Sequence, residues 1–147
     1  MLRETVDNGQ WTKDNGQRTL DHFEYNEHGK PFIEGGLHFS ISHCKEGIAV
    51  VVDDEPIGID IEHIRLASDD LIERVMNEEE QRLIAEASAP DRAFTKLWTQ
   101  KEAIVKAEGT GIESFEQLRD IRNQHSAFSI QTFESEKYIY SKAYKQH

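Results

Sequence analysis

One short run of residues constrains the fold of this chain more than any other. Residues 57–62 read Ile-Gly-Ile-Asp-Ile-Glu, and their alternation of apolar and acidic side chains has the period of a β-strand. Asp60 and Glu62 therefore leave the same face of that strand. Two like charges held a few ångströms apart raise one pKa unless a proton, a basic side chain or a hard divalent metal relieves them. The pair is either a cation site or two acids on a solvated strand face.

A third acid lies on a predicted helix. The helix begins near Pro90, a favourable first-turn residue, and ends at Gly109. Its apolar stripe comprises Phe94, Leu97, Trp98, Ile104 and Val105. Glu102 borders this stripe, where it could close a site with the two strand acids. The alternative is an ordinary ion pair with Lys106, four residues further along the helix.

Further strands and helices complete one architecture. The other strands are expected at residues 37–42, 48–52, 127–133 and 138–144, and two short helices at 69–76 and 77–87. The turn residues 53–56 predict an antiparallel hairpin between 48–52 and 57–62. We expect an α+β fold, in which a mostly antiparallel sheet packs against the long helix. Residues 1–28 are expected to form an N-terminal arm or small ribbon, and residues 29–147 a single domain.

Composition argues against several classes of protein. The net charge is −11, from 28 acidic and 17 basic residues, which disfavours binding to nucleic acid. Cys44 is the only cysteine, so no intrachain disulfide can form, and a reducing cytoplasm is the expected location. No apolar run approaches the roughly 18 residues that a membrane span needs, so we expect no membrane association.

Two polar segments before the acidic strand have the chemistry of an anion site. Ser42 and His43 end a predicted strand, where hydroxyl, imidazole and backbone amide can converge on a phosphate. Adjacent residues on an extended chain point to opposite faces, which disfavours a Ser-His nucleophile pair. Lys30 offers a cation on a turn made rigid by Pro31. A strand-end histidine bonded to a carbonyl and an ordinary surface turn are the alternatives.

Four motifs follow one another along residues 29–111. They are Gly29-Lys30-Pro31, Phe39-Ser40-Ile41-Ser42-His43, Gly58-Ile59-Asp60-Ile61-Glu62 and Trp98-Thr99-Gln100-Lys101-Glu102-Ala103, with Lys106 and Gly109 after the last. In order and spacing they resemble the 4′-phosphopantetheinyl transferase superfamily. The Gly-Lys-Pro and Ser-His motifs look more like the surfactin-synthetase-activating group than the short holo-acyl-carrier-protein synthase group.

The resemblance implies an enzyme that transfers the phosphopantetheine arm of coenzyme A to a serine of an apo acyl or peptidyl carrier protein. Adenosine 3′,5′-bisphosphate would be released. By motif position, Asp60, Glu62 and Glu102 would hold Mg²⁺ on the pyrophosphate of coenzyme A, and Mn²⁺ could replace it. Glu102, directly or through a water, would also take the proton of the carrier serine.

The resemblance also implies how coenzyme A is held. The residues concerned are Lys30, Pro31, Ser42, His43 and Lys106. Lys106 would contact the pyrophosphate and share the catalytic role with Glu102, while the others would lie at the 3′-phosphate and ribose end. Glu80, in a short predicted helix, aligns with another acid of the family and is a weaker candidate.

Two groups of side chains could dock the carrier. The basic group is Lys96, Lys101, Arg119 and Arg122, and the apolar group is Ile112, Phe115 and Leu118. Ordinary core packing is the alternative for the apolar group, and we expect it for at least two of the three.

The chain departs from the longer family members in one respect. Only 28 residues precede Gly29, too few for a complete N-terminal half, so the basic residues that such a half adds to the adenine pocket cannot be placed. A second copy of the chain in a homo-oligomer could complete the pocket. The alternatives are a non-catalytic remnant that binds coenzyme A or a partner protein, and a metal-dependent phosphohydrolase.

Overall fold

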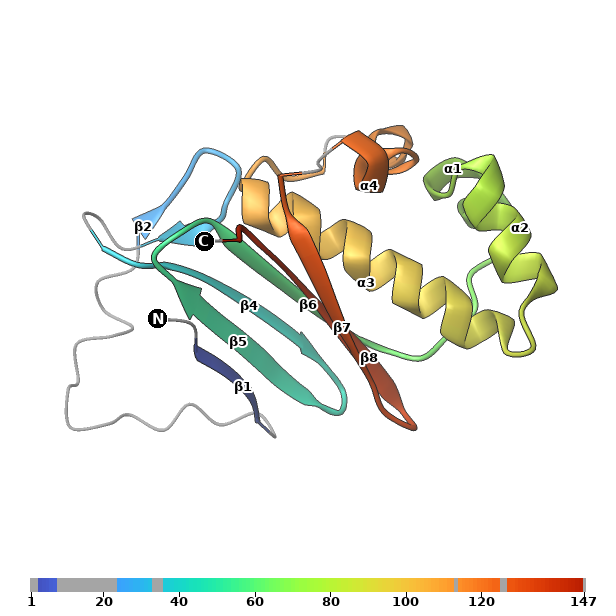
Figure 1. Cartoon of the computed structure of the whole chain (residues 1–147), viewed down its shortest axis with the longest axis horizontal. Helices are drawn as coiled ribbons and strands as arrows, with labels where there is room; N and C mark the ends of the chain where they lie inside the picture. The colour runs from blue at the N-terminus through green and yellow to red at the C-terminus, as the bar shows by residue number, and fades with distance from the viewer. Residues whose placement is uncertain (1–2, 8–23, 33–35, 113, 125–126, 147) are drawn as a thin grey trace.

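The computed structural model describes residues 3–7, 24–32, 36–112, 114–124 and 127–146 (Figure 1). The strands are β1 (Arg3–Asp7), β2 (Glu24–Tyr25), β3 (Pro31–Phe32), β4 (His38–Cys44), β5 (Gly47–Asp53), β6 (Ile57–His63), β7 (Ser129–Glu134) and β8 (Tyr138–Tyr144). The helices are α1 (Asp69–Val75), α2 (Glu78–Glu86), α3 (Pro90–Glu108) and α4 (Ile121–Gln124), with a 3₁₀ turn η2 (Phe115–Leu118). The expected α+β class, with a mostly antiparallel sheet against a long helix, is confirmed.

The larger strands form two antiparallel sheets that meet along one seam. The strand order is β1-β5-β4 in one sheet and β6-β8-β7 in the other. At the seam β4 and β6 lie side by side, and two serine hydroxyls of β4 accept hydrogen bonds from backbone amides of β6 (Figure 1). Ser40 lies beside Ile59, and Ser42 lies beside Ile61. Because both numbers rise together, β4 and β6 run in the same direction.

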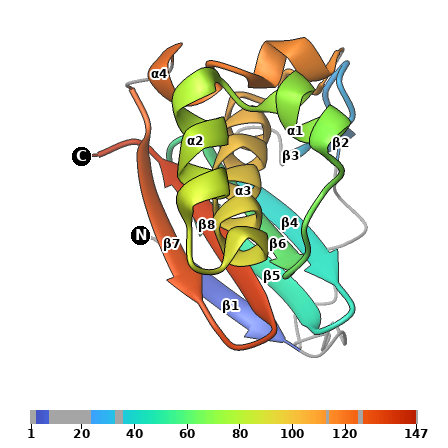
Figure 2. The same cartoon turned by 90° about the vertical axis from the view of Figure 1, so that its right-hand side faces the viewer.

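The long helix α3 lies directly on the second sheet, between that sheet and α2 (Figure 2). Gly58 makes this approach possible, because a Cβ there would stand 2.1 Å from the carbonyl oxygen of Ala103 and 2.4 Å from the amide nitrogen of Ala107. No side chain fits at such distances. Since Asp60 and Glu62 share the face of Gly58, they are turned toward the same helix.

Two apolar cores stabilise this arrangement. The first lies around α3 and includes Val75, Met76, Ile84, Phe94, Leu97 and Ile104. The second lies between the two sheets and comprises Ala49, Val51, Ile57, Ile59 and Ile61. The strand β6 therefore buries its apolar face in the second core and gives its acidic face to α3. No helix in the described part of the chain is long and apolar enough to cross a membrane.

The ends of the helices follow local sequence signals. Pro90 opens α3, and Gly109 ends it with φ +73°, a left-handed conformation that glycine adopts without strain. Asn77 caps α2 by accepting from the amide of Glu80, whose carboxylate accepts from the amide of Asn77 in return. The two expected boundaries of α3 are confirmed, and so is the expected start of α2 at Asn77, which is its cap residue.

The expected hairpin between residues 48–52 and 57–62 is wrong. β5 pairs with β4 on one edge, through the tight turn at Lys45 and Glu46, and with β1 on the other. Both edges of β5 are thus occupied, and β6 pairs with β8 instead. The turn chemistry predicts a change of direction, but it does not say which strand edge is open to receive the next strand.

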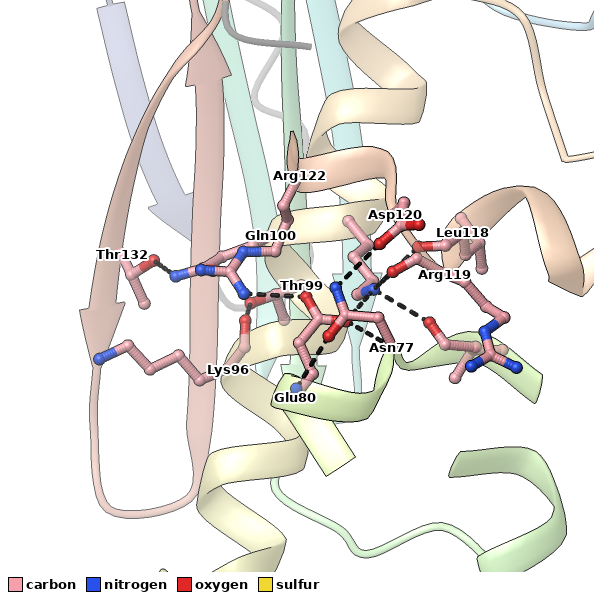
Figure 3. A network of polar contacts seen from close by, with 12 residues as sticks. Asn77, Glu80, Lys96, Thr99, Gln100, Leu118, Arg119, Asp120, Arg122 and Thr132 are labelled. Carbon is pink, nitrogen blue, oxygen red and sulfur yellow. Dashed lines mark hydrogen bonds and ion pairs between the residues drawn. The ribbon is translucent and has the colours of Figure 1, made fainter. Parts of the chain in front are cut away.

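A buried polar network ties the small helices to α3 (Figure 3). Lys101 is fully buried, and its ammonium donates to Glu80 Oε1 at 2.5 Å and to the carbonyls of Val75, Leu118 and Arg119 at 2.8 to 3.0 Å. The other carboxylate oxygen of Glu80 accepts from Arg122 at 2.9 Å. The network joins the end of α1, the start of α2 and the end of η2 to one side chain of α3.

This network corrects the expected basic docking surface. Lys101 cannot belong to a surface, because it is fully buried, and the guanidinium of Arg122 is paired with Glu80. Of the apolar docking candidates, Leu118 is buried in the core whereas Ile112 and Phe115 are exposed, so fewer of them pack in the core than expected.

We predict that Lys101→Met lowers the free energy of unfolding by about 3–5 kcal/mol, because it removes one of the donors to the buried Glu80 carboxylate and the shared donor of three carbonyls. Urea denaturation measures this loss. Lys96→Met is the matched control on the same helix: Lys96 is 47% exposed and 3.6 Å from Glu134, so its loss should stay below about 1 kcal/mol. Equal losses of stability in the two variants would contradict the stabilising role of the buried network around Lys101.

Candidate functional site

Three acids and one lysine meet where β6 faces α3. Asp60 and Glu62 come from the strand, and Glu102 and Lys106 come from the helix, one turn apart. The ammonium of Lys106 donates to Asp60 Oδ1 at 3.2 Å, and Asp60 is only 4% exposed. Glu62 and Glu102 both act electrostatically on Asp60. The structure thus brings together the three acids that the sequence analysis assigned to a metal and the lysine assigned to the pyrophosphate.

All three carboxyl groups have a raised pKa. Burial raises the pKa of Asp60 well above its usual range, Lys106 opposes this, and the negative charges of Glu62 and Glu102 add to it. Burial also raises the pKa of Glu62, and the positive charges of Arg65 and Lys106 oppose this rise. The pKa of Glu102 is likewise raised by burial, with Lys106 opposing the rise. Lys106 thus acts on all three acids and does not neutralise them, so the site is short of positive charge.

One atom of Asp60 fits a divalent cation. In the described part of the chain, Asp60 Oδ2 is buried and has no hydrogen-bond partner. A buried carboxylate oxygen without a donor is unfavourable, and carboxylate oxygens are the ligands that Mg²⁺ takes from proteins. No group of three or more His, Cys, Asp or Glu side chains among the described residues forms a ready-made metal cage. Mg²⁺ commonly needs only one or two carboxylates together with substrate phosphates, so the residues fit it.

Ser42 lies at this acidic site. Its buried hydroxyl donates to Asp60 Oδ1 at 3.1 Å and accepts from the amide of Ile61 at 3.0 Å. His43, the next residue, is exposed, as the alternation of a strand predicts, and it lies near enough to Glu62 to oppose the rise in the pKa of that carboxyl. The contacts of Ser42 and His43 with a phosphate stay predictions.

Lys30 lies beside the C-terminal end of α3. Its ammonium donates to the carbonyls of Lys106 at 2.5 Å, Ile57 at 3.0 Å and Ala107 at 3.4 Å. Burial lowers the pKa of Lys30 to about 8. These bonds fasten the turn before β3 to the end of α3 and the start of β6. The role of Lys30 toward coenzyme A stays a prediction, and so does that of Pro31, whose side chain lies outside the described residues.

A cavity of about 240 Å³ connects Lys30 with Lys106. Its lining also includes His28, Ser40, Gly109 and Gly111. The glycines leave room beside His28, because a Cβ on Gly111 would meet that side chain at 3.4 Å. His28 was not assigned from the sequence, although it lies next to the Gly-Lys-Pro motif, which was the available signal.

Trp98 is a second residue whose role the sequence analysis missed. It was assigned only to the apolar stripe of α3, and it does stack on Phe94 with ring centroids 6.0 Å apart. Its side chain also lies close enough to Glu62 to oppose the rise in the pKa of that carboxyl. Trp98 precedes Glu102 by one turn of the helix, so its place beside the acids was the available signal.

Comparison with known proteins gives one consistent result. The family model described as ACPS, 4′-phosphopantetheinyl transferase superfamily, matches residues 56–147. Among curated relatives, 4′-phosphopantetheinyl transferase gsp of Aneurinibacillus migulanus is 36% identical over 92 residues, which are 61% of this chain and 39% of that protein. 4′-Phosphopantetheinyl transferase HetI of Nostoc sp. is 37% identical over 65% of this chain and 45% of that protein. 4′-Phosphopantetheinyl transferase Sfp of Bacillus subtilis strain 168 is 30% identical over 84% of this chain and 57% of that protein. The chain thus spans 39% to 57% of the length of these three relatives.

We predict that Asp60→Asn leaves the free energy of unfolding level or raises it by up to about 2 kcal/mol when a chelator is present. The amide removes a buried negative charge that Glu62 and Glu102 repel, and this gain offsets the lost pair with Lys106. Urea denaturation measures the effect.

Glu80→Gln is the contrasting variant. Glu80 is equally buried, but two cations satisfy it, so its substitution should lower the free energy of unfolding by at least about 2 kcal/mol. If Asp60→Asn is as destabilising as Glu80→Gln, the acidic site is not short of positive charge.

Proposed function

Because the chain belongs to the 4′-phosphopantetheinyl transferase superfamily, we propose that it transfers the 4′-phosphopantetheine group of coenzyme A to a serine of an apo carrier protein. The acceptor is an acyl or peptidyl carrier. The serine oxygen forms a bond to the phosphorus that bears the pantetheine, the pyrophosphate P–O bond breaks, and adenosine 3′,5′-bisphosphate leaves.

One observation carries this proposal. Three carboxylates from two elements converge beside Lys106, and one buried oxygen of Asp60 has no donor among the described residues. Such a cluster is unfavourable in the absence of a cation, and a purely structural role would be served better by apolar residues. The arrangement suits a protein that holds a cation together with a polyphosphate.

The acids have distinct duties in the proposed reaction. Asp60, Glu62 and Glu102 would hold Mg²⁺, or Mn²⁺, which when bound neutralises charge on the pyrophosphate oxygens. Trp98 lies beside Glu62 and favours its charged form. Glu102 also takes the proton of the carrier serine, directly or through a water.

Basic side chains serve the nucleotide. Lys106 reaches the acids from α3 and is 30% exposed, so its ammonium can turn from Asp60 to the pyrophosphate. The cavity between Lys106 and Lys30 receives the rest of coenzyme A, and its lining supplies His28 as a further donor. His43, exposed at the end of β4, lies at the 3′-phosphate and ribose end together with Lys30 and Pro31.

The intact mass of an apo carrier protein tests the proposal. After incubation with this chain, coenzyme A and Mg²⁺, we expect the carrier to gain the mass of one phosphopantetheine. Glu102→Ala should slow this gain by about 100-fold or more. Glu86→Ala, an exposed acid at the end of α2, is the matched control and should act as the native chain does.

A failure of this experiment has a definite meaning. If a panel of acyl and peptidyl carriers gains no mass while the chain still binds coenzyme A, the transferase proposal is wrong and the chain is a coenzyme A-binding protein. Release of adenosine 3′,5′-bisphosphate without any carrier would instead identify a hydrolase.

A further inference from the structure

Two serines of β4 have almost the same surroundings. Ser40 and Ser42 lie two residues apart on one face of the strand and are 4% and 5% exposed. Ser40 Oγ accepts from the amide of Ile59 at 3.1 Å, and Ser42 Oγ accepts from the amide of Ile61 at 3.0 Å. Both hydroxyls thus satisfy backbone donors of β6 at the seam between the sheets.

Only one of these two hydroxyls reaches the acidic site through a hydrogen bond in the described part of the chain. Ser42 Oγ also contacts Asp60 Oδ1 at 3.1 Å. A hydroxyl has one hydrogen to donate. Since the amide of Ile61 already donates to Ser42 Oγ, the hydroxyl hydrogen of Ser42 points to Asp60.

The two oxygens of Asp60 are therefore unequal. Oδ1 accepts from Ser42 and from Lys106, whereas Oδ2 is buried and receives no hydrogen bond from any residue that the structure describes. The donor from Lys106 sits on a long side chain that is 30% exposed, but the donor from Ser42 sits on a short buried one. The backbone of Ser42 is itself fixed opposite Ala49 in the pairing of β4 with β5. Ser42 is thus the more rigid of the two partners of Asp60.

We propose that Ser42 is a positioning residue for the cation: by holding Oδ1, it fixes the rotation of the Asp60 carboxylate and presents Oδ2 to a divalent metal. The inference rests on the proposed function, and it replaces the phosphate contact expected for the Ser42 hydroxyl. Ser40 stabilises the seam and takes no part in orienting Asp60. Partners that orient a metal ligand in this way typically account for about 10- to 100-fold in metal affinity.

Binding of Mn²⁺ in the presence of coenzyme A, without any carrier protein, tests this proposal apart from turnover. A chelator first removes bound metal from the protein. Mn²⁺ is then added, and electron paramagnetic resonance measures the Mn²⁺ that stays free. We expect Ser42→Ala to weaken the Mn²⁺ affinity by about 10-fold or more. Ser68→Ala is the binding control: its hydroxyl also accepts from a backbone amide, that of Leu71, but at the start of α1, and this variant should stay within about threefold of the native chain. Ser40→Ala serves only in urea denaturation, because Ser40 lines the cavity assigned to coenzyme A. There it and Ser42→Ala should show similar losses of stability, since each loses one acceptor for an amide of β6.

Each outcome decides one question. If the native chain binds no Mn²⁺ with coenzyme A, the proposed function fails and the role of Ser42 fails with it. If the native chain binds Mn²⁺ and Ser42→Ala binds it equally well, or if Ser68→Ala weakens the binding as much as Ser42→Ala does, the proposed function stands and the role of Ser42 is overturned. Should Ser42→Ala show no cooperative unfolding, Ser42→Cys takes its place, because a thiol of similar size is a poor donor and carries the same expectation.

Discussion

The close contact between β6 and α3 at Gly58 is the constraint on which the rest of the structure depends. With the missing Cβ position only 2.1 Å from the Ala103 carbonyl, the strand and the helix approach as nearly as their backbones allow. The side chains that follow Gly58 on the same face of β6 are therefore brought against side chains of α3. Asp60 and Glu62 are opposed to Glu102 and Lys106 for this reason, and Lys30 fastens the end of the contact through the carbonyls of Ile57, Lys106 and Ala107.

Two of the buried acids, Glu80 and Asp60, show how different the consequences of burial can be. Glu80 is satisfied by Lys101 and Arg122, and its network joins three short elements to α3. Asp60 is crowded by two further acids, and none of the described residues donates to its Oδ2. The first arrangement stabilises the fold by itself. The second is unfavourable as it stands, which is typical of a functional site.

Local patterns predicted the parts of the structure that local physics decides. Neighbouring residues alone were enough to predict the strand at 57–62 and the acids on one of its faces. The same is true of the boundaries of α3 at Pro90 and Gly109. The pairing of β5 could not be predicted in this way, because it depends on which strand edges are occupied. The burial of Lys101 was also missed, since its acceptors come from residues 17 to 26 positions away. The contact of Ser42 with Asp60 needed the seam between two sheets.

In the proposed function, Asp60, Glu62 and Glu102 hold a divalent metal on coenzyme A between β6 and α3. The decisive experiment is a crystal structure of the chain with coenzyme A and Mn²⁺, with anomalous scattering used to locate the metal. We expect one Mn²⁺ peak that contacts Asp60 Oδ2 and the pyrophosphate oxygens. Coenzyme A bound with its pyrophosphate on basic side chains alone, or a Mn²⁺ peak away from Asp60, would contradict it.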